Sequence, residues 1–255
     1  MLFLAPHRPS YDLVGRDDLL RDLKQRLFAG GSLALCALNG LPGVGKTALA
    51  VDLANDREAL GHFYDGVLWA GLGRKADVLS HLGAWGVALG IPSGEIAKLT
   101  SVEDRAKVIH AAIGMRRMLL VADDAWQVEA ALACKLGGPN CAHLVTTRLP
   151  EVALRFAGGE TTVVHELNED DGLTLLARLA SEVVEAEPNE ARELVRAVGG
   201  LPLALILMGN YLRVQMHSGQ PRRLRTALDR LRRTEERLRL AQPQVPLEHH
   251  PSLPA

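Results

Sequence analysis

Apolar and polar positions follow a repeating block pattern over the first two thirds of the chain. Five short apolar runs bounded by turn-forming residues predict strands buried on both faces, at residues 32–39, 65–72, 116–124, 142–148 and 161–167. Before and between these runs, apolar residues three and four positions apart predict helices at 16–31, 46–60, 75–90 and 101–114. Strands that alternate with helices indicate an α/β fold, a mainly parallel sheet with helices on both faces.

The pattern changes at Asn168. From there the chain shows only helical periodicity and residues that interrupt helices. These breakers are Pro188, Gly199, Gly200 and Pro202. We therefore expect an α/β domain over residues 1–167 and a small all-helical domain over 168–241. The segment 242–255 is rich in proline and predicts a linker or tail.

A glycine-rich stretch, NGLPGVGKTALA, joins the first predicted strand to the helix that follows it. Residues 40–47 match the phosphate-binding pattern G-x-x-x-x-G-K-[ST], the P-loop. Small residues let successive backbone N–H groups converge on phosphate oxygens, and the helix directs its positive end at the same place. We expect Lys46 to reach the β and γ phosphates and the Thr47 hydroxyl to ligate Mg²⁺. The nucleotide-binding residues expected in this stretch are Gly43, Val44, Gly45, Lys46, Thr47 and Ala48.

Two acidic residues end the third predicted strand, and an arginine ends the fourth. Side chains at the carboxyl ends of parallel strands face the crevice where ligands bind. We expect Asp123, on a strand next to that of the P-loop, to hold the hydration shell of Mg²⁺, and Asp124 to orient or deprotonate the attacking water. Arg148 is expected to sense the γ-phosphate and stabilise charge in the transition state. These residues predict a P-loop NTPase, with Lys46, Asp124 and Arg148 as its catalytic residues.

Five motifs follow one another along the chain: LVGRDDLL, GLPGVGKT, LLVADDAW, LVTTR and GGLPLAL. In this order they resemble the NB-ARC family of signal-transduction (STAND) ATPases over residues 13–239. The resemblance implies that Val14, Gly15 and Arg16 border the adenine of ADP or ATP, and that Pro202 closes over the base from the helical domain. It also implies a molecular switch that hydrolyses ATP slowly, as the regulatory core of a larger signalling or transcription-regulating protein.

The family resemblance also implies domains beyond the five motifs. Members normally continue into a winged-helix domain, in which the histidine of a Met-His-Asp motif contacts the β-phosphate of ADP. The Met216-His217 pair lies in the helical region and no Asp follows it. We therefore expect the winged-helix domain and the sensor or repeat domains to be missing from this chain. The full protein is expected to self-assemble under nucleotide control.

The charge and composition of the chain narrow the possible partners and functions. The formal net charge is −1 and 4% of the residues are aromatic, so bulk binding of a polyanion is not expected. The arginine-rich segment 221–240 carries leucines at helical spacing, and we interpret it as an amphipathic helix docked on its own domain rather than a nucleic-acid site. A working ATPase of the helicase or initiator-loader type, acting on nucleic acid, is the alternative to the switch.

The remaining features concern the cell compartment. No apolar stretch reaches the roughly 20 residues of a membrane helix, and the apolar start of the chain is too short for a signal peptide. Cys36, Cys134 and Cys141 show no metal-ligand spacing, and we expect them to be buried, reduced thiols. We therefore expect a cytoplasmic protein with no membrane partner.

Overall fold

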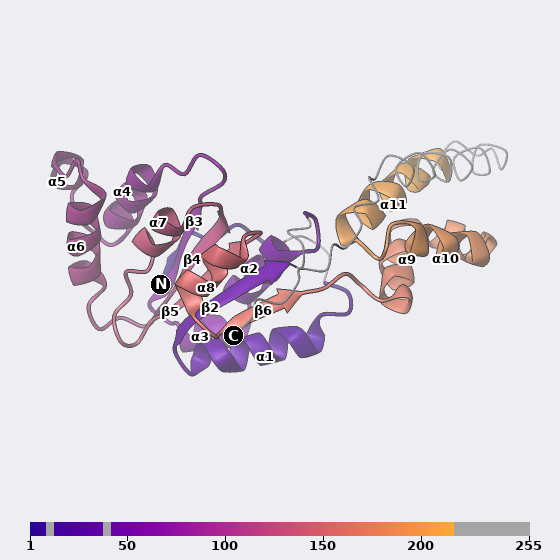
Figure 1. Ribbon diagram of the computed structural model, residues 1–255, viewed down its shortest axis with the longest axis horizontal. Helices are drawn as coiled ribbons and strands as arrows, with labels where there is room; N and C mark the ends of the chain where they lie inside the picture. Colours follow the sequence, from indigo (N-terminus) through magenta and orange to yellow (C-terminus); the bar gives the residue numbers. More distant parts are fainter. Residues whose placement is uncertain (9–12, 38–41, 217–255) are drawn as a thin grey trace, which may run out of the picture. The chain divides into compact units, whose positions relative to one another are not determined.

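The computed structural model describes residues 1–8, 13–37 and 42–216 (Figure 1). The chain divides into two compact units, Met1–Glu166 and a second unit that begins at Leu167. The sequence predictions for His217, the segment 221–240 and the segment 242–255 fall outside the described residues, as do residues 38–41 at the start of the predicted P-loop.

The first unit is built on a six-stranded sheet in which all paired strands are parallel. The order across the sheet is β1-β3-β4-β5-β2-β6. The strands are β1 (Leu2–Phe3), β2 (Gly31–Ala37), β3 (Gly66–Gly71), β4 (Met118–Ala125), β5 (Ala142–Thr147) and β6 (Thr161–Val164). The predicted parallel α/β fold is thus confirmed. The two-residue strand β1 is an addition, since so short a run gives no periodic signal.

Helices follow most of the strands of this sheet. They are α1 (Asp17–Phe28), α2 (Lys46–Ala54), α3 (Arg57–His62), α4 (Val78–Ala88), α5 (Ser93–Lys98), α6 (Val102–Ile113), α7 (Val128–Ala133) and α8 (Pro150–Ala157). The periodicity does not predict α5, α7 and α8, which have eight residues or fewer. In the described part of the chain, no helix is both long and apolar enough to pass through a bilayer.

The helix predicted over residues 46–60 is in fact two helices, α2 and α3. Between them the carboxylate of Asp56 accepts hydrogen bonds from the backbone N–H groups of Glu58 and Ala59, each at 3.0 Å. Aspartate is a favoured residue at this capping position, because it satisfies N–H groups that have no partner inside the helix. The Asp56 cap therefore begins a second helix within a segment whose apolar residues recur at helical spacing throughout.

Both faces of the sheet are packed. One apolar core joins α4, α6, α7 and α8 to alternate strand residues, among them Leu68, Leu120 and Val145. Successive side chains of a strand point to opposite faces, so the intervening buried residues, such as Leu119 and Leu144, belong to the other face. The helix α1 lies along the side of the sheet away from α4 (Figure 1). The predicted cysteines are free and buried, at Cys36, Cys134 and Cys141.

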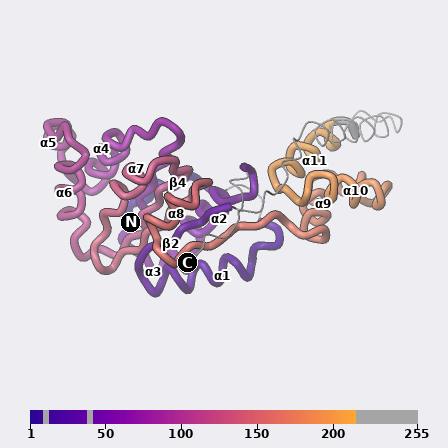
Figure 2. The backbone as a smooth tube through the Cα atoms, in the orientation of Figure 1, coloured from indigo at the N-terminus to yellow at the C-terminus, as the bar shows by residue number. Residues whose placement is uncertain are grey.

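The second unit contains α9 (Glu169–Ala186), α10 (Pro188–Ala197) and α11 (Pro202–Met216). The helix α9 packs against both α10 and α11 (Figure 2). Asn168 caps α9, because its side-chain oxygen accepts the backbone N–H of Asp171 at 2.8 Å. The helices predicted after Asn168 are confirmed as far as Met216, and prolines begin two of them, as the fixed backbone angle of proline favours.

His143 is a buried polar residue near the start of β5, with 7% of its surface exposed. Its Nε2 accepts the backbone N–H of Gly137 at 2.9 Å, and its Nδ1 lies 3.4 Å from the carbonyl oxygen of Gly31. These partners match a neutral ring with its proton on Nδ1. Burial lowers the pKa of His143 to about 4, and the charge of Lys135 also lowers it.

We expect the free energy of unfolding to fall as the pH drops from 6.5 to about 4. In this window the unfolded chain binds a proton on His143 that the folded chain does not bind. The stability that the neutral ring contributes is therefore complete above the unfolded pKa and is lost as the pH falls to the folded pKa. The full loss is about 3 kcal/mol. Urea unfolding curves at several pH values measure it, and in His143→Gln this part of the pH dependence should disappear. An unchanged pH dependence in the variant would contradict the assignment.

Candidate functional site

The residues expected at the phosphates and the metal lie at or just after the carboxyl ends of β2, β4 and β5. The prediction that Asp123 lies on a strand next to that of the P-loop is wrong, because β5 lies between β2 and β4 and pairs with both. Order along the chain does not determine order in a sheet when every connection is a crossover. The consequence is that residues at the end of β5 stand between the P-loop and the two aspartates.

The glycine-rich loop after β2 ends at Gly45, the N-cap residue of α2. Its φ of 104° lies in the left-handed region, which favours glycine, and Gly43 has a φ of 83°. No described side chain caps α2. The first backbone N–H groups of this helix, at Lys46, Thr47 and Ala48, are therefore the donors that a phosphate would meet there.

Lys46 is a buried cation at the start of α2, with 8% of its surface exposed. Burial lowers the pKa of its ammonium group, and the positive charge of Arg148 lowers it further, while Asp124 and Asp123 act in the opposite direction. A phosphate beside this ammonium would favour its charged form. The position of Lys46 therefore suits a polyanionic ligand.

Asp123 connects the P-loop helix to β5 through one carboxylate oxygen. Its Oδ1 accepts the hydroxyl hydrogens of Thr47, at 2.8 Å, and of Thr146, at 2.6 Å. Burial raises the pKa of this carboxyl, and the two hydroxyl hydrogen bonds act against that shift. The cluster brings together the two residues expected at the metal, and sequence reasoning did not include Thr146.

A hydroxyl and a carboxylate side by side are the oxygen donors that Mg²⁺ takes together with phosphate and water. Within the described residues, no group of three or more His, Cys, Asp or Glu side chains could bind a metal ion. A metal held by Thr47 and Asp123 would therefore take its other ligands from phosphate and water. The donor set fits a magnesium-nucleotide complex better than a metal bound by protein ligands alone.

A β-bulge places the second aspartate. Three steps along β4, from Ala122 to Ala125, pair with only two steps along β5. Asp124 has a φ of 51° and is the one non-glycine with positive φ among the described residues. Its backbone N–H donates to the Thr146 hydroxyl oxygen at 2.9 Å instead of to a strand carbonyl. In a regular strand neighbouring side chains would face opposite ways, and a bulge re-aims them.

Arg148 follows β5 directly and approaches Asp124. Its Nε lies 3.9 Å from the Asp124 Oδ1, and its guanidinium carbon lies 5.3 Å from the centre of the Trp126 ring. The structure thus brings Lys46, Asp123, Asp124 and Arg148 to one edge of the sheet. At this edge, two carboxylates and two cations surround the start of α2.

The segment before α1 lies against the P-loop. Arg16 is buried, and its Nη2 donates to the carbonyl oxygens of His165, at 2.6 Å, and Val44, at 3.4 Å. Val14 is buried, and Gly15 has a φ of 64°. The Arg16 side chain therefore links this segment to the loop and to the chain just after β6. The expected contact of the segment with adenine stays a prediction.

Pro202 lies in the second unit, at the first position of α11. Its expected contact with adenine stays a prediction too. Three residues near the site were missed in the sequence. Thr146 had a weak signal, since two threonines end a buried strand, and so had Trp126, a large aromatic two residues after the aspartates. Arg74 gave none, because a charged residue in a loop is most often solvated.

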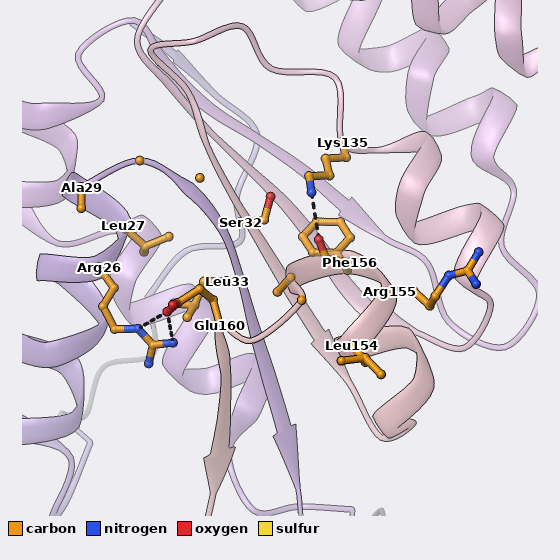
Figure 3. Close-up of a pocket in the computed structure, with 14 residues that line it drawn as sticks. Arg26, Leu27, Ala29, Ser32, Leu33, Lys135, Leu154, Arg155, Phe156 and Glu160 are labelled. Carbon is orange, nitrogen blue, oxygen red and sulfur yellow. Dashed lines mark hydrogen bonds and ion pairs between the residues drawn. The ribbon is translucent and has the colours of Figure 1, made fainter.

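A cavity of about 760 Å³ lies at the other edge of the sheet, where β2 and β6 begin. In Figure 3 the side chain of Arg26 turns toward Glu160, with hydrogen bonds of 2.8 and 3.1 Å, and Lys135 donates to the carbonyl oxygen of Phe156 at 2.9 Å. These cations are already engaged by the protein, and none of the motif residues lines the cavity. The residues predicted to bind phosphate lie at the carboxyl edge instead.

Comparisons with known proteins agree with this geometry. The model of the NB-ARC domain matches residues 16–186. The regulatory protein AfsR of Streptomyces griseus is 33% identical over 208 residues, which are 79% of this chain and 21% of that protein. The chain therefore spans about a fifth of the length of this curated relative.

Two solved structures share the fold. The ORC2 protein of Aeropyrum pernix, in ADPNP-ADP complexes, aligns with a TM-score of 0.59 at 13% identity, over 88% of this chain and 70% of that one. A signal transduction ATPase with numerous domains (STAND) from Pyrococcus horikoshii, with a tetratricopeptide repeat sensor, aligns with a TM-score of 0.50 at 20% identity, over 81% of this chain and 30% of that one.

We expect Thr146→Val to lower the free energy of unfolding by about 1–3 kcal/mol, because the Asp123 carboxylate and the Asp124 N–H each lose a partner. Urea unfolding at neutral pH measures the change. Thr161→Val on β6 makes the same chemical change where no such cluster exists among the described residues, and should stay within about 0.5 kcal/mol. Equal losses in the two variants would show that the hydroxyl of Thr146 has no special role.

Proposed function

The chain belongs to the NB-ARC domain family, and from that premise we propose that it is a nucleotide-dependent switch that binds ADP or ATP with Mg²⁺ and hydrolyses ATP slowly. The observation that carries the proposal is the cluster of Thr47, Asp123 and Thr146, which joins the P-loop helix to β4 and β5. A protein of the same fold was solved in ADPNP-ADP complexes, which supports an adenine nucleotide as the ligand.

We assign the phosphates to the start of α2. The backbone N–H groups of the loop and of the first helical turn would donate to the α and β phosphates, and the Lys46 ammonium would reach the β and γ phosphates. The buried position of Lys46 supports this role, since a cation with little solvent gains most from a fixed anionic partner. The adenine is assigned to Val14, Gly15, Arg16 and Pro202.

The metal is assigned to Thr47 as ligand and to Asp123 as the residue that holds its hydration shell. When bound, Mg²⁺ neutralises charge on the β and γ phosphate oxygens. The hydrogen bond that joins Thr47 to Asp123 keeps the two oxygen-bearing side chains close together. Thr146 holds the carboxylate of Asp123 from the other side, so the acidic group cannot turn away from the loop.

Asp124 and Arg148 are assigned to the hydrolysis step. Asp124 would orient or deprotonate the attacking water, and Arg148 would stabilise the charge that develops on the γ-phosphate. The Nε of Arg148 lies 3.9 Å from the Asp124 carboxylate, so the cation that should meet the γ-phosphate also has an acidic neighbour. Asp124 and the γ-phosphate would compete for the guanidinium of Arg148. This competition supports slow turnover of ATP, which suits a switch.

We place this switch inside a larger cytoplasmic protein for signalling or transcription regulation. AfsR is a regulatory protein, and the matched part is 21% of its length. In the proposed cycle ADP holds the full protein closed and ATP opens it for self-assembly. A winged-helix domain and sensor repeats elsewhere in that protein would contribute the signal and the lock on ADP.

A working ATPase of the helicase or initiator-loader type makes a different prediction about turnover. Such an enzyme should hydrolyse ATP rapidly and respond to nucleic acid, whereas the switch should turn over slowly and ignore it. ATP hydrolysis by the purified chain, measured with and without duplex DNA, separates the two proposals. A strong stimulation by DNA would favour the alternative.

We expect Lys46→Ala to abolish saturable binding of ADP and ATP while the chain stays folded, because the variant removes the cation that the P-loop motif itself provides at the start of α2. Calorimetric titration measures the binding, and circular dichroism measures the fold. Lys75→Ala, at an exposed lysine in the loop after β3, should bind both nucleotides as the unmodified chain does. Retained micromolar affinity in Lys46→Ala would mean that the phosphates bind elsewhere.

We expect Asp124→Asn to separate binding from hydrolysis. Asn adopts the left-handed backbone conformation as readily as Asp, so the bulge should persist. ATP hydrolysis should fall by about 10²-fold or more, the scale on which an acid–base group acts, while ADP and ATP affinities stay close to their original values. Single-turnover hydrolysis and calorimetry measure the two properties. A matching loss of affinity would refute this division of roles between Asp123 and Asp124.

A further inference from the structure

Trp126 lies just after β4 and contacts two cations. The guanidinium carbon of Arg74 lies 4.3 Å from the centre of its ring, and that of Arg148 lies 5.3 Å away. Both distances fall within the roughly 6 Å over which a cation is attracted to an aromatic face. The arrangement follows from the sheet, because β3, β4 and β5 are adjacent and these three residues follow their carboxyl ends.

The ring is not fixed by a hydrogen bond of its own. The indole N–H of Trp126 is buried and has no hydrogen-bond partner among the described residues. Buried indole N–H groups usually find such a partner. The position of the Trp126 ring therefore depends on packing and on the two guanidinium groups. The ring in turn restrains the positions of Arg74 and Arg148.

An aromatic ring holds a cation in a way that a carboxylate does not. A carboxylate neutralises the charge of an arginine, whereas a ring restrains the guanidinium and leaves its net charge in place. Arg148 has both kinds of neighbour, with Asp124 at 3.9 Å and Trp126 at 5.3 Å. The positive charge of Arg148 acts on the P-loop, because it lowers the pKa of Lys46. Arg148 is thus kept near the phosphate end of the site as a cation.

We propose that Trp126 is a positioning residue that holds Arg148 for the γ-phosphate, with Arg74 supporting the ring, and that it thereby strengthens the binding of ATP and not that of ADP. The proposal rests on the proposed function, in which Arg148 contacts the γ-phosphate. ADP lacks the group that Arg148 would meet. A change at Trp126 therefore affects ATP and spares ADP, whereas a merely structural role would affect both.

The first test compares nucleotide affinities of the full chain. Trp126→Leu removes the aromatic face, and Trp126→Phe keeps one. Calorimetry with ADP and with a non-hydrolysable ATP analogue should show the analogue bound about three- to thirty-fold more weakly by Trp126→Leu, with ADP within about twofold. Trp126→Phe should retain most of the affinity for the analogue. Equal weakening of both nucleotides by Trp126→Leu, or no weakening of either, would overturn the proposal.

A double-mutant cycle with Arg148→Ala separates this inference from the proposed function. Arg148→Ala should weaken the analogue and not ADP, and adding Trp126→Leu should cost nothing further. If Arg148→Ala spares the analogue, the γ-phosphate role of Arg148 fails, and positioning by Trp126 fails with it. If Arg148→Ala acts as expected while Trp126→Leu in the Arg148→Ala background causes a further loss, only the positioning role is wrong.

The second test uses fluorescence and changes the ring only conservatively, to phenylalanine. The difference in fluorescence between the unmodified chain and Trp126→Phe isolates the emission of Trp126. The ATP analogue should change this difference and ADP should not, because Arg148 moves relative to the ring only when a γ-phosphate is present. The change should vanish in Arg148→Ala. It should persist in Arg57→Ala, which alters an exposed arginine on α3. The same response to both nucleotides would contradict the proposal.

Discussion

One carboxylate oxygen of Asp123 joins the three elements that form the candidate site. Asp123 belongs to β4, and it accepts hydroxyl groups from Thr47 on α2 and Thr146 on β5. A buried carboxylate without partners is strongly disfavoured, so these two hydrogen bonds are what allow an acidic group at this depth. They also fix the P-loop helix against the edge of the sheet. The rest of the site takes its position from this contact.

Thr146 organises both aspartates with a single hydroxyl group. A hydroxyl donates one hydrogen bond and accepts others, and here it donates to the Asp123 carboxylate and accepts the backbone N–H of Asp124. The second bond satisfies a backbone group that the β-bulge removes from the regular ladder. The left-handed conformation of Asp124 therefore has a local cause. Strand β5 can provide this residue only because it lies between β2 and β4.

Local patterns in the sequence predict much of the fold, and partners distant in sequence account for what they miss. Buried strands need apolar runs and a phosphate loop needs glycine, so the parallel α/β fold and residues 40–47 can be identified without a structure. Which strands lie side by side is a non-local property, and for that reason the neighbour of β2 was assigned wrongly. The role of Thr146 depends on that neighbour. A threonine in a buried strand gives no sign of whether its hydroxyl meets a carboxylate or a carbonyl.

The arrangement of cations bears on how such a domain distinguishes two nucleotides. A ligand shifts an equilibrium only by the difference in its affinity for the two states, so groups that contact ADP and ATP alike contribute binding without control. In the proposed site, Lys46 and the start of α2 suit the binding of either nucleotide, since both ADP and ATP carry the β-phosphate that these groups would meet. Arg148 suits the discrimination between ADP and ATP, because it follows a separate strand and its neighbours are Trp126 and Asp124 rather than the loop. In the proposed site, two sets of residues that follow different strands would therefore allow tight binding and discrimination to be adjusted independently.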